Sequence, residues 1–471
     1  MKKILISSAF LIASATVYAA AIEQVIVRQQ WPWSTDIKVE YKLSGVTEPV
    51  DLTVRAYNGP KELPIPSSSI SGDRFAISEG GVGQLMIDPI AAFGTGKIAL
   101  ANFKIKLSVA PSPSNMDDVL YKVINLSEPY DVTHITRADL LNEKYGAYET
   151  SFSALNPNFS TLMDPADVII WTGVTNDVKY KTSHLVLRKI PAARKSFMFQ
   201  KGIASVNGGA GVKVTFPNDF YIGVFEVTQA QLAKIVTHPN AGEGGGSNET
   251  NALYAACRPV NRISFGKQYR TGLRGYTNGL RWPEGDHTSV DAVSFMGKLQ
   301  SNTGLLCDLP TEAMWEYACR ALSPSDELYT GVASSDAQAA LIMRAFHINC
   351  VNEGLQTPKL FAATAPSNCD LTDGTAQVGS YLPNAWGLYD MLGNMWEFCL
   401  DKYGEISGDD LYDPRGPAEY TTANMRVVRG GAYNIARGEC LCTTRASLSD
   451  VTEYRQCGFR VCVYMDEEES K

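Results

Sequence analysis

One stretch, Asn384–Cys399, constrains the fold more strongly than any other feature of the chain. It reads Asn-Ala-Trp-Gly-Leu-Tyr-Asp-Met-Leu-Gly-Asn-Met-Trp-Glu-Phe-Cys, which mixes large aromatic side chains with glycines and acids. This mixture has neither the period of about 3.6 residues of an amphipathic helix nor the alternation of a half-buried strand. Gly387 and Gly393 suit tight backbone bends, and the aromatic side chains would fill a core on either side. We therefore expect an irregular, packed loop.

Asp390 and Glu397 place two acids on this loop. Carboxylates and backbone carbonyls that point inward from an irregular loop are the oxygen ligands that calcium prefers. The loop thus indicates a calcium site. The alternative is a packed aromatic turn whose acids are solvated and whose backbone is held by its own hydrogen bonds.

Five further motifs stand in a fixed order around this loop. Together they resemble the sulfatase-modifying-factor family, which includes the formylglycine-generating enzymes and has a variant of the C-type lectin fold. The resemblance covers about residues 195–465 and implies an α+β domain there. The motifs are Phe220–Gln231, Arg258–Ser264, Leu309–Arg320, Val428–Tyr433 and Gly458–Val461.

The resemblance makes the calcium prediction specific. In the family, one structural calcium is bound by the side chain at the position of Asp390, the carbonyls at Gly393 and Met395, and the carboxylate at Glu397. This sequence has suitable residues at all of these positions. A second calcium site of the family is not placed by the sequence within the 340–375 loops.

An oxidase function depends on two cysteines. Formylglycine-generating enzymes bind copper(I) through two thiolates and use oxygen to convert a substrate cysteine to formylglycine. In the family pattern the two positions fall at Ile435 and Cys440 here, and isoleucine cannot bind a metal. Ala432 stands where the family has an active-site serine, whereas Trp396 matches an active-site tryptophan. If the chain is an enzyme, Cys440 and Trp396 are its expected catalytic residues.

Cys442 leaves two alternatives open. In an extended segment Cys440 and Cys442 would face the same side and could bind one copper in a rebuilt pocket. Alternatively, Cys440 or Cys442 forms a disulfide, and the resemblance implies Cys319 as the partner. Nearby arginines are expected to be buried and to hold loop carbonyls, without a catalytic role. These are Arg429, Arg445 and Arg460.

The cysteine and histidine patterns limit the other chemistries. All 10 cysteines lie between Cys257 and Cys462, and the even count in an exported chain suggests disulfides in the C-terminal domain. No Cys-x-x-Cys pair occurs, which argues against a zinc ribbon or a thioredoxin-like centre. The 5 histidines are scattered and give no ligand triad for non-heme iron.

The N-terminus is typical of a secretory signal peptide. Two lysines precede an apolar run that ends in small residues, so residues 1–21 are expected to be removed on export. The protein is then secreted, periplasmic or at the cell surface, and no later apolar run is long enough to span a membrane. Removal of Lys2 and Lys3 shifts the net charge from -8 to -10, which argues against nucleic acid as a partner. Residues 467–471 are an acidic tail.

The region before the C-terminal domain reads as β-structure. Short alternating runs with turn residues between them predict an antiparallel, immunoglobulin-like β-sandwich over 22–110. Residues 111–194 are expected to form a second β-rich unit or extension, and 195–466 the sulfatase-modifying-factor domain. The runs that carry the first prediction are 36–43, 51–56, 83–87 and 103–109.

Two functional hypotheses follow. The first is a non-catalytic module on a calcium-stabilised C-type lectin-like scaffold that binds a protein or carbohydrate ligand outside the cytoplasm. The second is a formylglycine-generating oxidase, dependent on copper and oxygen, that matures exported sulfatases. Ile435, at a position where the oxidases have a sulfur, favours the binding module.

Overall fold

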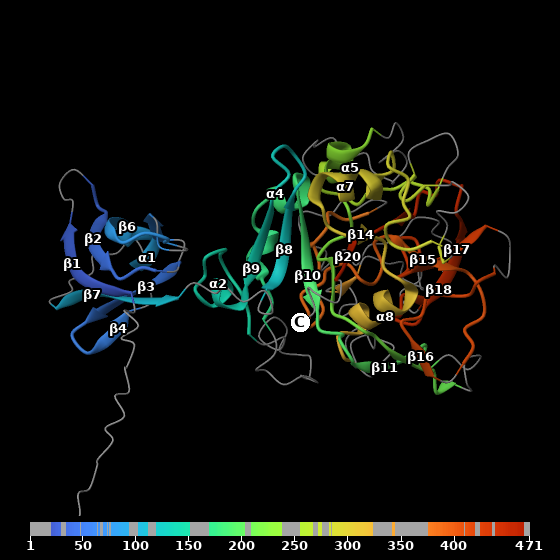
Figure 1. Ribbon diagram of the computed structural model, residues 1–471, viewed down its shortest axis with the longest axis horizontal. Coiled ribbons are helices and arrows are strands. Elements are labelled where there is room, and N and C mark those ends of the chain that lie inside the picture. Colours follow the sequence, from blue (N-terminus) through green and yellow to red (C-terminus); the bar gives the residue numbers. More distant parts are fainter. Residues whose placement is uncertain are drawn as a thin grey trace, which may run out of the picture. The chain divides into compact units, whose positions relative to one another are not determined.

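The computed structural model divides the chain into two compact units (Figure 1). The first comprises Met1–Ser114 with Asn142–Lys144, and the second comprises Asn115–Leu141 and Tyr145–Lys471. The structure describes residues 20–29, 34–47, 49–63, 65, 69–72, 74, 77–93, 102–111, 119–150, 169–202, 209–237, 255–266, 272–275, 282–283, 285–323, 342–343, 375–408, 410–419, 424–435 and 439–465.

The chain is rich in short strands. The strands are β1 (Ala21–Gln29), β2 (Ile37–Ser44), β3 (Val50–Asn58), β4 (Lys61–Leu63), β5 (Ile70–Gly72), β6 (Gly81–Ile87), β7 (Phe103–Pro111), β8 (Val119–Asn125), β9 (Val132–Thr136), β10 (His184–Ile190), β11 (Ser196–Phe199), β12 (Val212–Thr215), β13 (Phe220–Gly223), β14 (Cys307–Asp308), β15 (Trp396–Lys402), β16 (Asp410–Tyr412), β17 (Met425–Arg429), β18 (Arg445–Ser449), β19 (Cys457–Gly458) and β20 (Cys462–Tyr464). The helices are α1 (Pro89–Phe93), α2 (Arg137–Leu141), α4 (Lys179–Thr182), α5 (Gln229–Ile235), α7 (Phe295–Thr303) and α8 (Glu312–Arg320), with a 3-10 turn, η4, at Thr172–Thr175.

The first unit consists of two antiparallel sheets around one apolar core. One sheet has the order β1-β2-β6-β5 and the other β4-β3-β7. In β2 the side chains of Val39, Tyr41 and Leu43 are buried on one face, as the alternation predicts, and they meet Leu52 and Leu107 of the other sheet. The two-sheet architecture agrees with a β-sandwich. Its immunoglobulin-like topology remains a prediction.

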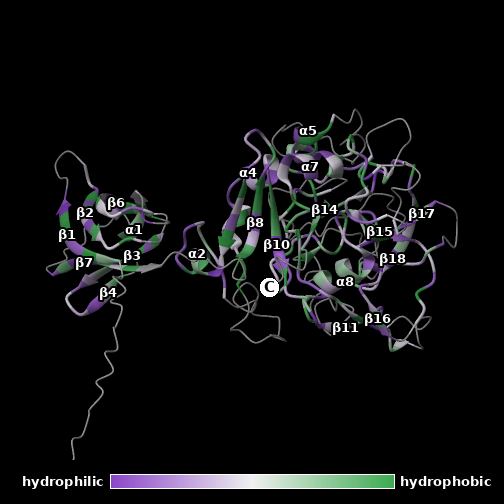
Figure 2. Ribbon diagram, viewed as in Figure 1, coloured by the Kyte–Doolittle hydropathy of each residue, from purple (hydrophilic) through white to green (hydrophobic). Residues whose placement is uncertain are grey.

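The second unit contains one antiparallel sheet and two smaller mixed sheets. Its largest sheet has the order β14-β20-β13-β10-β8-β9, and Figure 2 shows that β8 and β10 are largely hydrophobic. The strands expected in an extension at 111–194 join this sheet through β10, which pairs with β13, so this segment belongs to the C-terminal unit. The smaller sheets have the orders β18-β17-β15-β19 and β11-β12-β16, each with one parallel pair.

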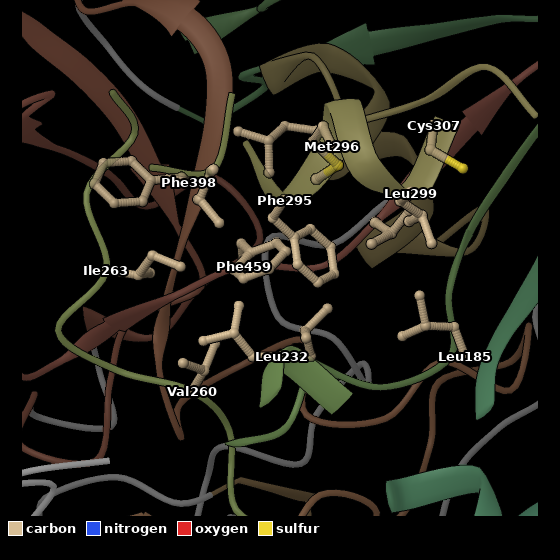
Figure 3. Packing of buried hydrophobic residues seen from close by; sticks show 14 of the residues in the cluster. Leu185, Leu232, Val260, Ile263, Phe295, Met296, Leu299, Cys307, Phe398 and Phe459 are labelled. Carbon is tan, nitrogen blue, oxygen red and sulfur yellow. The ribbon is translucent and has the colours of Figure 1, made fainter. Parts of the chain in front are cut away.

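One core of this unit lies between α5, α7 and the sheets. Figure 3 shows Leu232 from α5, Phe295 and Leu299 from α7, and Phe398 from β15 around Phe459. The rings of Phe295 and Phe459 meet edge to face with centroids 5.2 Å apart. All of these side chains are fully or almost fully buried. Helices this short are stabilised by this packing more than by intrinsic propensity.

Threonine caps begin two of the helices. Thr228 caps α5 in a reciprocal capping box with Gln231, and Thr311 accepts from the amide of Met314 at the start of α8. Helix α7 begins at Phe295 with Ser294 as its N-cap, and Val293, just before the cap, is exposed.

Several expectations fall outside the described residues. The signal sequence up to residue 19, the 344–374 loops and the acidic tail 467–471 belong to this group. Within the described part of the chain, no helix combines the length and the apolar character needed to cross a membrane.

Candidate functional site

The central loop is irregular as far as Met395 and then continues as strand β15. Asn384 fixes its start, because its side-chain oxygen accepts from the amides of Trp386 and Leu388 while its side-chain nitrogen donates to the carbonyl of Ala318. Gly387 has a positive φ of 77°. A side chain there would press against Ile170, so the expected glycine bend is present.

Asp390 is a buried residue of this loop. It is only 2% exposed to solvent, and its backbone φ is 57°. Its Oδ2 accepts from the amide of Gly379 at 2.7 Å. Its Oδ1 is buried and has no hydrogen-bond partner among the described residues. An orphaned carboxylate oxygen is costly in a protein interior, so this oxygen is suited to a cation.

Glu397 is held by two side chains that are far away in sequence. Arg460 donates to both of its oxygens at 2.7 Å, and the indole nitrogen of Trp315 donates to Oε2, also at 2.7 Å. Such a bidentate arginine–carboxylate contact is strong and strongly directional. Oε1 receives one of these bonds and retains one acceptor position.

A third carboxylate, Glu226, holds the same loop from the opposite side. It accepts from the backbone amide of Met395 at 3.0 Å and from the side-chain nitrogen of Asn394 at 2.6 Å. It is fully buried. Sequence reasoning did not single it out, although an acid within the apolar run 221–227 is a signal, since a buried charge requires partners.

The three acids affect one another electrostatically. Burial, followed by repulsion from Asp390 and Glu397, raises the pKa of Glu226 well above its usual range. Burial raises the pKa of Asp390 to about 6, although the amide of Gly379, Arg460 and Lys181 each act to lower it. Glu226 and Asp390 are therefore harder to ionise than free carboxyl groups.

These residues fit a calcium ion in part. Asp390 offers an unused oxygen and Glu397 one remaining acceptor position. Among the residues that the structure describes, no group of three His, Cys, Asp or Glu side chains is arranged to hold a metal. Such an ion would therefore need backbone carbonyls, as proposed for Gly393 and Met395.

Cys440 is fully buried beside the Arg-Gly-Gly turn. A side chain at Gly431 would lie 2.5 Å from its sulfur, so only glycine fits there. Burial raises the pKa of the Cys440 thiol to about 12, although the amides of Ala432 and Gly393 oppose the shift. The thiolate needed for metal binding is therefore disfavoured. Ile435 packs against the same core.

Cys442 does not pair with Cys440. Its sulfur lies 3.3 Å from that of Cys319 on α8, and both residues are fully buried. All eight cysteines that the structure describes are unbonded thiols. The expected neighbours, Cys319 and Cys442, are thus in contact but not covalently linked.

Trp396 and Ala432 belong to the core around Phe459, not to the core that contains Cys440. Trp396 is 7% exposed, so its ring mainly fills that core. The structure therefore brings Cys440, Ala432 and Trp396 into the packed interior, where all three are buried.

The expected buried arginines also hold carboxylates. Arg429 donates to Glu312 at 3.0 Å and Glu316 at 2.7 Å, as well as to carbonyls of the 442–443 turn. Arg445 holds both oxygens of Glu312 and the carbonyl of Gly404. This network fixes α8 against β17 and β18.

Residues 195–465 match the family of sulfatase-modifying factor enzyme 1-like domains. The formylglycine-generating enzyme of Mus musculus is 27% identical over 293 residues, which are 54% of this chain and 68% of the mouse enzyme. The serine/threonine-protein kinase pkn1 of Chlamydia pneumoniae is 34% identical over 141 residues, which are 29% of this chain but only 18% of the kinase.

A solved structure, Treponema denticola variable protein 1, is similar with a TM-score of 0.42 and 20% identity, covering 59% of this chain and 95% of that one. The mixed sheets and few short helices of the second unit fit a C-type lectin-like fold.

Proposed function

The chain belongs to the family of sulfatase-modifying factor enzyme 1-like domains, and from this premise we propose that it is a non-catalytic module that binds a protein or carbohydrate outside the cytoplasm. The surroundings of Cys440 carry the proposal. Its thiol is fully buried, which raises its pKa, and the position of a second sulfur is held by Ile435, which packs half-buried against the same core.

The residues present do not fit the two-thiolate copper site of an oxidase. Cys442 is the nearest alternative sulfur in sequence, but it is directed to Cys319. Ala432 offers no hydroxyl. A soft copper(I) ion needs a second sulfur donor, which an isoleucine cannot supply.

Calcium is proposed as a structural ion of the scaffold. Asp390 and Glu397 would supply side-chain oxygens, and the carbonyls at Gly393 and Met395 the remainder. The orphaned Oδ1 of Asp390 supports this assignment. When bound, the ion would offset negative charge of the acids and hold the loop in place.

Export is part of the proposal. The signal sequence at 1–21 directs the chain out of the cytoplasm, and in that oxidising environment Cys319 and Cys442 are proposed to form a disulfide. Their contact of 3.3 Å supports the pairing. The N-terminal unit is proposed to be an immunoglobulin-like sandwich that acts as a spacer or adhesive element.

The test is an anaerobic copper(I) titration of the full chain, followed by oxygen and a cysteine-containing sulfatase peptide. The wild type is expected to bind copper weakly and to form no aldehyde. The matched variant Ile435→Cys, alone and with Ala432→Ser, restores the family's donors and is expected to gain thiolate–copper absorption. Tight stoichiometric copper and aldehyde formation by the wild type would reject the proposal.

The alternative is a formylglycine-generating oxidase. The family membership and the tryptophan at 396 favour it, together with the buried Cys440 that holds one of the two sulfur positions. It requires the wild type to assemble a copper site with a sulfur other than residue 435. The same titration decides between the two functions.

A further inference from the structure

A cavity of about 320 Å³ opens at the N-terminal end of α8. It lies between the start of this helix, the end of β15 and the 404–417 segment. Neither Cys440 nor any residue of the Asp390 loop lines it. Its volume lies at the lower end of the range of roughly 300–1,000 Å³ that is usual for small-molecule sites.

The walls of the cavity are mainly apolar. Phe199, Ala313 and Leu411 form the sides, and Pro414 and Pro417 stiffen the covering segment. Tyr412 stands on the rim and is 69% exposed. An exposed aromatic ring beside an apolar wall is suited to covering an alkyl chain.

Asp401 lies at the floor and is 4% exposed. Its Oδ2 accepts from the backbone amide of Glu312 at 2.7 Å. A Cβ at Gly416 would lie 2.7 Å from its Oδ1, so the covering segment packs closely against this oxygen. This carboxylate is almost fully buried and lines the cavity.

The cations near Asp401 are already engaged elsewhere. Arg445 holds both oxygens of Glu312, and Arg426 donates to the carbonyls of Leu400 and Trp282. Burial, followed by repulsion from Glu312, raises the pKa of Asp401 to about 7. Arg445 and Arg426 oppose this shift, but Asp401 shares both cations with the acceptors that they already hold.

The rim adds negative charge. Glu405 and Asp413 are exposed and line the cavity. The one lining arginine, Arg415, is held away, because its guanidinium lies 4.1 Å from the ring of Trp282 and donates to the carbonyl of Gly285. This charge distribution repels anions and attracts cations.

A metal ion fits the cavity poorly. Calcium takes about 6–8 oxygen ligands, whereas here Glu312 is committed to two arginines and the walls are apolar. An organic cation fits better, because it needs one carboxylate for its charged end and an apolar wall for its stem.

We propose that this cavity binds an organic cation, an amine or guanidinium on a short alkyl chain, with Asp401 as its counter-ion. The cation has two sources, a free amine or a lysine or arginine side chain of a polypeptide. The site goes beyond the proposed function and holds whether or not Cys440 is catalytic, since amine binding and aldehyde formation are separate readouts.

Calorimetric titration of the full chain tests the proposal, with n-pentylamine as probe and n-pentanol as uncharged control. The wild type is expected to bind the amine and not the alcohol. Asp401→Asn keeps the shape and removes the charge, and it is expected to weaken amine binding at least about tenfold. Glu419→Gln changes an exposed acid that does not line the cavity and is expected to bind like the wild type.

Two rim variants keep the test decisive if Asp401→Asn does not fold. Tyr412→Ala and Glu405→Gln change exposed residues and are each expected to weaken binding about two- to fivefold, within the range of a single exposed contact. Unchanged amine binding in folded Asp401→Asn, or in both rim variants, would overturn the proposal. So would a calcium signal lost in Asp401→Asn without any amine signal.

A blocked lysine tripeptide separates the two sources. Tighter binding of the tripeptide than of n-pentylamine indicates a polypeptide side chain, and equal or weaker binding indicates a free amine. Both outcomes support the site.

Discussion

The two ends of strand β15 carry buried carboxylates with opposite environments. Glu397 and Asp401 both contact α8. Glu397 is bound by Arg460 and by the indole of Trp315, whereas Asp401 accepts one backbone amide, that of Glu312. The first carboxylate is part of a closed interior and the second faces a cavity. A buried charge with its partners in place maintains the fold, while one without them is available to a ligand.

The same asymmetry appears along α8. From Trp315 onward the helix lies against Glu397, and its Cys319 contacts Cys442; we call this the closed end. The first residues of the helix, at Glu312, lie against Asp401 and the cavity; we call this the open end. The family motifs gather at the closed end, whereas the open end is formed in part by the 404–417 segment, which lies outside those motifs.

The largest expected effect concerns the closed end. Arg460→Met leaves the carboxylate of Glu397 buried without its cation, so we expect a loss of roughly 3–5 kcal/mol in the free energy of unfolding. Denaturant unfolding measures it. The control is Lys213→Met, which breaks an exposed ion pair with Asp410 and should change stability by about 0–1 kcal/mol. A similarly small loss in Arg460→Met would mean that the closed end does not depend on this pair.

The next prediction concerns the two thiols in contact at the closed end, Cys319 and Cys442. In protein produced through an oxidising compartment, mass spectrometry should find Cys319 linked to Cys442. Reduction should then lower the free energy of unfolding by roughly 2–4 kcal/mol, because the unfolded chain regains the entropy of an open loop. Reductant should not change the stability of Cys442→Ala. Two free thiols in the oxidised wild type would contradict the proposal.

Calcium should also act at the closed end. At calcium about 100-fold above its dissociation constant, the folded state gains about 2.7 kcal/mol, and a chelator should remove this gain in thermal unfolding. Asp390→Asn removes a charged ligand and should abolish most of the response. Asp401→Asn, at the open end, should retain it. A chelator without effect on the wild type would rule out the ion.

The smallest effect is a pH dependence at the open end. The folded-state pKa of Asp401 is raised to about 7 by burial and by Glu312, above an unfolded value of about 3.9. Its contribution to stability is therefore present below about pH 4 and lost as pH rises through 7. Relative to Asp401→Asn, the wild type should lose stability as the pH rises from 4 to 8.

Urea unfolding of both proteins across this pH range measures the difference, which removes contributions common to the two, such as those of Asp390 and Glu226. A pH-independent difference would mean that Asp401 is ionised throughout, with a cation already beside it. The other charged groups around Asp401 are Glu312, Glu405, Asp413, Arg415, Arg426 and Arg445.

Features that depend on residues close together in the sequence could be predicted from it. Thr228 and Thr311 cap helices because a hydroxyl just before a helix satisfies a free amide, and this can be read from neighbouring residues. The bend at Gly387 and the alternation of β2 are similarly local. The start of β15 at Trp396 was missed, since the aromatic and glycine content of the preceding loop masked the alternation that follows.

The sequence by itself determined the caps, the strand faces, the order of the family motifs and the isoleucine at position 435. Only the tertiary structure decided which charges are compensated. The partners of Glu397 lie 63 and 82 residues away, and those of Glu312 up to 133 residues away. Glu226 reaches the loop across 169 residues. Hydrophobic periodicity records which face of an element is buried, but it carries no information on which buried charges meet. For that reason the cavity beside Asp401 became visible only when α8, β15 and the 404–417 segment were placed together.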